Sequence, residues 1–77
     1  MLKSFELKPE QVGSYLKMIT AAILEDSHNK GSLRKAIWLY LIKHYSKAVD
    51  YTEFLFAIKR FINDGKIINR DGIFTIH

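Results

Sequence analysis

The sequence contains no cysteine, only one proline and only four glycines in 77 residues. Without cysteine the chain can form neither a disulfide nor a thiolate metal site, so it must fold on a hydrophobic core. No apolar run approaches the roughly 20 residues that a membrane-spanning helix needs, and the N-terminus lacks the pattern of a signal peptide. We therefore expect one small, soluble, intracellular domain with no membrane partner.

Catalytic and metal-binding patterns are missing as well. The three histidines, His28, His44 and His77, have no spacing to one another or to nearby carboxylates that would form a metal site. No nucleophile motif and no phosphate-binding glycine loop occurs. We expect a protein that is not an enzyme and that uses no cofactor, no metal and no small-molecule substrate.

Acidic residues are scarce in the second part of the chain. Residues 1–29 carry three lysines against four carboxylates, a net charge of −1. Residues 30–77 carry nine basic side chains against four acidic ones, a net charge of +5. This imbalance favours an anionic partner for residues 30–77, and the alternative is a set of ordinary solvated lysines.

Hydrophobic periodicity predicts three helices, over residues 14–26, 33–45 and 51–64. In the first helix, apolar residues recur at i, i+3, i+4, i+7 and i+8 from Tyr15 and form one stripe. Gly13 is expected to separate this helix from a turn that starts at Pro9. The chain is then divided into an N-terminal arm, residues 1–13, and a folded domain, residues 14–77.

Local signals predict the ends of the third helix and the structure beyond it. Asp50, with Glu53 three residues later, is typical of a capping box, and Gly65 is well placed to end the helix. Two short runs of β-branched and aromatic residues then flank Asp71-Gly72, a typical hairpin turn. Three helices and a β-hairpin predict a mainly α fold of the winged-helix class, with a helix-turn-helix core and the hairpin as the wing.

The apolar stripes predict which side chains form the core. The second helix is expected to bury Leu33, Ile37, Tyr40, Leu41 and either His44 or Tyr45, and the third helix Phe54, Ile58, Phe61 and Ile62. This assignment leaves Leu39 and Ile42 facing outward, with Trp38 at the edge. Two interpretations stay open: the arm covers them with Met1, Leu2, Phe5 and Leu7, or they form a protein-binding patch or the seam of a weak homodimer.

Three segments resemble the globular domain of linker histones. The stretch "SYLKMITAAI" (14–23) is similar to the first helix of that family, "GSLRKAIWLYLIKHY" (31–45) to the second, and "FAIKRFINDGKI" (56–67) to the third helix and its exit. The resemblance covers residues 14–77. It implies a winged-helix domain that binds duplex DNA in chromatin, in the nucleus if the source is eukaryotic and otherwise in an intracellular, DNA-associated location.

The resemblance also implies which basic residues contact DNA. Arg34, Lys59 and Arg60 match basic positions of the family, whereas Leu39 and Ile42 stand where the family has lysines. Independently of the resemblance, Lys59 and Arg60 must point outward because core residues flank them. With the two basic residues of the wing added, the predicted DNA contacts are Arg34, Lys59, Arg60, Lys66 and Arg70. Phosphate contacts carry no sequence information, so we expect low specificity.

The alternative function is a protein-interaction module that uses Trp38, Leu39 and Ile42.

Overall fold

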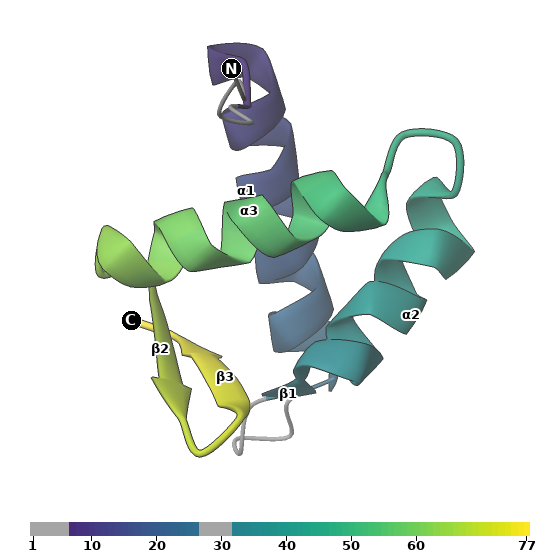
Figure 1. Ribbon diagram of the computed structural model, residues 1–77. Coiled ribbons are helices and arrows are strands. Elements are labelled where there is room, and N and C mark those ends of the chain that lie inside the picture. Colours follow the sequence, from purple (N-terminus) through teal and green to yellow (C-terminus); the bar gives the residue numbers. More distant parts are fainter. Residues whose placement is uncertain (1–6, 27–31) are drawn as a thin grey trace.

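The computed structural model describes residues 7–26 and 32–77, and in them three helices and three short strands. In chain order these elements are α1 (Pro9–Asp26), β1 (Ser32–Leu33), α2 (Arg34–Tyr45), α3 (Tyr51–Asn63), β2 (Ile67–Arg70) and β3 (Ile73–Ile76). Figure 1 shows α3 crossing α1, with α2 on one side and the β2–β3 hairpin under the C-terminal end of α3. This is the predicted winged helix, with the hairpin as its wing.

Helix α1 starts at Pro9, not at Ser14, so the predicted break at Gly13 is wrong. Proline suits the first position of a helix, where its missing N–H would have no partner within the helix. The backbone N–H of Lys8 donates to Oε1 of Gln11 at 2.8 Å, which caps the start of the helix. This cap offsets the weak helix propensity of Gly13. The helix therefore includes residues 9–13 of the predicted arm.

The buried core draws on all three helices and on the hairpin. Its members are Tyr15, Met18, Ile19, Ala22, Ile23, Ile37, Leu41, Phe54, Ala57, Ile58, Phe61, Ile67 and Phe74. The stripe predicted for α1 is therefore confirmed in full. In α3, three of the four predicted residues are buried, Ile62 is partly buried, and Ala57 joins them because it lies one turn from both Phe54 and Phe61.

The predicted core of α2 needs one correction, at Leu33. Ile37 and Leu41 are buried, and Tyr40 packs partly buried against the core. Of the two alternatives at the end of the helix, Tyr45 packs partly buried against the core and His44 is exposed. Leu33 is 55 % exposed and belongs to a strand, not to the helix. Its backbone is extended, with φ −74° and ψ 152°, and it precedes the first helical residue.

Strand β1 was not predicted, because two residues are too few to show a period. It pairs antiparallel with β3, where Ser32 is opposite Phe74 and Leu33 opposite Ile73. The strand order is therefore β1-β3-β2, and the wing becomes a three-stranded sheet. Because α2 begins at the next residue, this pairing fixes the start of α2 to the wing.

The hairpin turn forms at the predicted dipeptide. Asp71 has a φ of 54° and Gly72 a φ of 87°, so both central residues are left-handed, as a type I′ turn requires. Arg70 and Ile73 are paired on either side of this two-residue loop. The turn matches the right-handed twist of the strands and holds the wing in one register.

A hydrogen-bond network joins the start of α3 to α1. Oδ2 of Asp50 accepts from the backbone N–H of Glu53 at 3.1 Å, which confirms the predicted N-cap. The N–H of Asp50 donates instead to the hydroxyl of Tyr15 at 2.9 Å, and that hydroxyl donates to Oε1 of Glu53 at 2.8 Å. Nε2 of Gln11 donates to the other carboxylate oxygen at 3.1 Å. Tyr15 thus occupies the centre of the capping box and links two helices.

The end of α3 is a Schellman motif. Gly65 has a φ of 77°, its N–H donates to the carbonyl of Ile62 at 3.1 Å, and the N–H of Lys66 donates to the carbonyl of Phe61 at 2.9 Å. This pair of bonds reverses the chain and starts β2. The position of the wing beside α3 therefore depends on a glycine at residue 65.

Substitution of alanine for two glycines of this domain should change its stability in opposite directions. Gly65→Ala places a side chain in the left-handed region and should destabilise the domain by about 1–2 kcal/mol. Gly13→Ala, inside α1, should stabilise it by about 1 kcal/mol. An added Cβ meets no atom within 4 Å at either position, so backbone conformation alone decides the sign. Urea unfolding midpoints measure both changes, and two shifts of the same sign would contradict the assigned conformations.

The Tyr15 network makes stability sensitive to alkaline pH. Burial raises the pKa of Tyr15 to about 12; the N–H of Asp50 opposes this rise and the carboxylate of Glu53 adds to it. The folded state therefore keeps a proton that the unfolded chain loses near pH 10, so the stabilisation is present below pH 10 and is lost as pH rises toward 12. Wild type should lose about 2–3 kcal/mol more than Tyr15→Phe across this interval.

At neutral pH the same Tyr15→Phe variant should be less stable by about 1–3 kcal/mol, because buried polar groups lose a partner. Tyr45→Phe is the matched control, since it removes a hydroxyl outside the network. Burial also raises the pKa of Tyr40, so the difference between variants, and not the absolute alkaline loss, is the measured quantity. Equal alkaline losses in wild type and Tyr15→Phe would show that the hydroxyl is not protected by folding.

Candidate nucleic-acid interface

A groove runs between α3 and the wing, and we call it the α3–wing groove. Its lining residues are Arg34, Leu55, Ile58, Lys59, Ile62, Asn63, Asn69 and Phe74. Arg34 is the first residue of α2, Lys59 lies in α3 and Asn69 in β2. None of these described lining residues is acidic. The fold thus brings two cations and two amides from separate segments to one surface.

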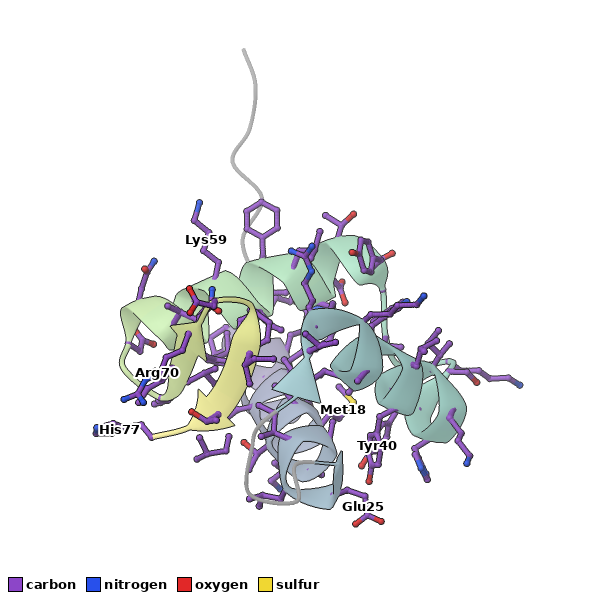
Figure 2. All side chains as sticks on the ribbon, turned by 90° about the horizontal axis from the view of Figure 1, so that it is seen from below. Met18, Glu25, Tyr40, Lys59, Arg70 and His77 are labelled. Carbon is purple, nitrogen blue, oxygen red and sulfur yellow. The ribbon has the colours of Figure 1, made fainter. Side chains whose placement is uncertain are left out.

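The packing of α3 determines the direction of Lys59. Its buried residues, Phe54, Ala57, Ile58 and Phe61, face α1 and the wing, which leaves Lys59 on the exposed side. Figure 2 shows its side chain extending outward from α3. Arg34 reaches the same groove because the pairing of β1 with β3 holds the start of α2 against the sheet.

Arg60 does not line the α3–wing groove. It lies one residue after Lys59 and so about 100° further around the helix axis. Its Nε is 3.7 Å from Oδ2 of Asp64, and the two side chains are 56 % and 45 % exposed. An exposed i, i+4 pair of this kind is worth only about 0.3–0.5 kcal/mol. The sequence suggests a single basic pair, but the structure directs its two members to different sides of α3.

The two basic residues of the wing also lie outside this groove. Side chains alternate between the faces of a strand, so Arg70 lies on the face opposite Asn69. Arg70 is exposed, and Figure 2 shows it pointing away from the domain on the side of the hairpin. Lys66 is exposed in the turn between α3 and β2. Of the five predicted residues, only Arg34 and Lys59 therefore share the groove.

A second groove adjoins the first, and we call it the Trp38 groove. Its lining residues are Leu33, Arg34, Lys35, Trp38, Tyr51, Asn69, Gly72 and Phe74. It shares Arg34, Asn69 and Phe74 with the α3–wing groove, so the two are continuous. Tyr51 and Asn69 were not among the predicted site residues. Lys35 was not predicted either, although it directly follows Arg34, which was.

The aromatic rings of Trp38 and Tyr51 form one wall of the Trp38 groove. The Trp38 and Tyr51 rings meet edge to face, with centroids 5.0 Å apart and planes at 69°. The Trp38 and Phe54 rings are also 5.0 Å apart and tilted by 37°. Because Phe54 is fully buried, this contact anchors Trp38 to the core. Trp38 is partly buried, and Tyr51 is 45 % exposed.

A third groove lies at the Tyr15 network and differs in charge. Its lining residues are Glu10, Gln11, Ser14, Tyr15, Lys17, Met18, Tyr45, Ala48 and Glu53. Two carboxylates against one lysine make this surface unsuitable for a polyanion. The basic and the acidic grooves therefore separate charge across the domain.

The outward direction predicted for two residues of α2 is confirmed. Leu39 is 52 % exposed and Ile42 is 37 % exposed. Leu7, one of the arm residues proposed to cover them, packs partly buried against the core. The other three, Met1, Leu2 and Phe5, lie outside the described residues.

Two further observations concern the part of the chain that the structure describes. Within residues 7–26 and 32–77, no three His, Asp or Glu side chains are grouped so that they could hold a metal ion. None of the helices there combines the length and the apolar character needed to cross a bilayer.

The order of the elements and of the strands defines a winged-helix protein with a helix-turn-helix core. A family model described as the linker histone H1 and H5 family matches residues 13–74. The chain belongs to this family, which is non-enzymatic and binds DNA in nuclear chromatin. No match was found among curated proteins or among solved structures.

Proposed function

We propose that this domain binds duplex DNA, with low sequence specificity, through α3 and the wing. The observation that carries the proposal is the convergence of Arg34 and Lys59 on one groove whose described lining has no carboxylate. Membership of a DNA-binding family supports DNA as the polyanion. The family also supports a nuclear, chromatin-associated location for this chain.

In this proposal, α3 approaches the major groove and the wing follows the neighbouring backbone. Arg34 and Lys59 neutralise phosphates from two sides of the α3–wing groove. Asn69 uses its side-chain oxygen to accept the N–H of Gly72 at 2.9 Å, which leaves its amide N–H groups for a phosphate oxygen. Contacts of this kind position a protein without reading bases.

The remaining basic residues would contact phosphates beyond the groove. Lys66 precedes β2 and Arg70 is its last residue; both are exposed and extend the cationic surface along the wing. Arg60 is held near Asp64 only by an exposed ion pair, which a phosphate could replace at little cost. We therefore propose that Arg34 and Lys59 contribute most, and that Arg60, Lys66 and Arg70 contribute less.

Charge reversal at one lysine tests the proposed phosphate contacts. If the five basic residues each neutralise a phosphate, log K should fall with log salt at a slope of about −4.5, from −0.9 per phosphate. Lys59→Glu should weaken binding to every duplex sequence and reduce the steepness of the slope by about 1. Fluorescence anisotropy at several salt concentrations measures both quantities.

Lys17→Glu is the matched control for this experiment. It makes the same change in net charge but lies on the acidic groove at the Tyr15 network. It should leave the salt slope unchanged. Equal losses in the two variants would mean that net charge alone drives binding, and an affinity that does not depend on salt would refute the proposed phosphate contacts.

A second candidate function is self-association through α2. It is favoured by the exposure of Leu39 and Ile42, which are neighbours on one face of the helix. Complete burial of such a side chain stabilises by about 1.5–3 kcal/mol, so two from each copy are enough for a weak dimer.

Replacing these two residues separates the second candidate from a structural role. Sedimentation equilibrium should show weak self-association of wild type at high concentration and a monomer for Leu39→Lys with Ile42→Lys. The double variant should keep its unfolding midpoint, because both side chains point to solvent. A wild type that stays monomeric would refute the dimer, and a variant that does not fold would assign both residues to the core.

A further inference from the structure

The Trp38 groove combines two features that duplex binding does not require. It has cations at its rim, Arg34 and Lys35, and an aromatic wall formed by Trp38 and Tyr51. Tyr51 is the first residue of α3 and leaves 45 % of its surface exposed, although its ring contacts two other rings. The described residues that line the groove include no carboxylate.

A polyanion with planar, apolar groups fits this combination. Proteins bind single-stranded nucleic acids by placing bases against aromatic side chains while cations neutralise the backbone. Bases within an intact duplex are stacked on one another and cannot present their faces to a ring. The chemistry of the groove therefore suits an unpaired base.

We propose that the Trp38 groove binds an unpaired base, so that the domain prefers DNA with a single-stranded gap over the intact duplex. The inference rests on the proposed function, because the adjoining duplex would lie in the α3–wing groove. The two grooves share Arg34 and Asn69, so one strand can pass from the first to the second without leaving the cationic surface. Lys35 then neutralises the phosphate next to the bound base.

An acidic peptide with an aromatic side chain would match part of the same chemistry. The shared residues favour nucleic acid, because Arg34 and Asn69 connect the Trp38 groove to the surface proposed for the duplex. A peptide ligand would need no such continuity. This alternative is therefore an outcome of the test and not a second proposal.

The chain has a single tryptophan, so its fluorescence reports directly on the Trp38 groove. The protein is titrated with an intact duplex, with the same duplex containing a short gap, and with oligothymidine. Stacking of one base should make the gapped duplex bind about 5- to 150-fold tighter than the intact one. The gapped duplex and oligothymidine should quench Trp38, and the intact duplex should not.

Two variants of Tyr51 isolate the aromatic contribution, and a variant of Lys35 tests the contribution of charge. Tyr51→Ala should remove most of the preference for the gap, whereas Tyr51→Phe, the matched control, should retain it because the ring remains. Lys35→Glu changes no ring and should weaken the gapped complex more than the intact one. Unfolding midpoints identify any variant that loses binding only because it loses its fold. If a Tyr51 variant does not fold, Lys35→Glu decides whether the Trp38 groove gives the preference for gapped DNA.

The outcomes distinguish this inference from the proposed function. Equal affinities for the two duplexes, without quenching, overturn the inference and leave duplex binding standing. Quenching by oligothymidine without any binding of intact duplex overturns the proposed function and supports an aromatic site for single strands. An acidic aromatic peptide that quenches Trp38 when none of the DNAs does overturns the inference in favour of a protein ligand.

Discussion

The hydroxyl of Tyr15 accepts a hydrogen bond from the backbone of Asp50 at 2.9 Å and donates one to Glu53 at 2.8 Å. These bonds close the N-terminal cap of α3 with a side chain from α1, so the cap and the helix packing form together. Buried polar groups are costly without partners, which makes the alignment of the two helices specific. Because α3 carries Lys59 and Tyr51, the position of both basic grooves depends on this junction.

The short strand β1 provides the second constraint. Its two residues pair with β3, and Arg34 follows directly at the start of α2. Arg34 is thereby held against the wing, where it lines both grooves. Tyr15 fixes the start of α3 and β1 fixes the start of α2, so residues far apart in the sequence form one cationic surface.

Local chemistry made much of the fold predictable from the sequence. The stripe from Tyr15, the cap at Asp50, the stop at Gly65 and the turn at Asp71 each depend on neighbours within a few residues, and the structure confirms all four. The predictions that failed depend on contacts between distant residues or on two local signals that favour different structures. Gly13 suggested a break, but the cap made by Gln11 extends α1 across it.

The candidate site was less predictable than the fold. The grouping of Arg34 with Lys59 depends on the register of β1, and the role of Asn69 depends on which face of β2 it occupies. Neither fact is encoded in a nearby residue. The separation of Arg60 from Lys59 follows from helical geometry and could have been anticipated from their adjacency.

In the proposed complex, DNA occupies the continuous surface around Arg34, Lys59 and Asn69. Backbone amide NMR of the labelled domain, titrated with a short duplex, tests this placement most directly. The largest shift changes should cluster at these residues and along the wing, with none at the acidic groove around Lys17. Shift changes concentrated at Lys17, or on the exposed face of α2 around Leu39, would contradict it.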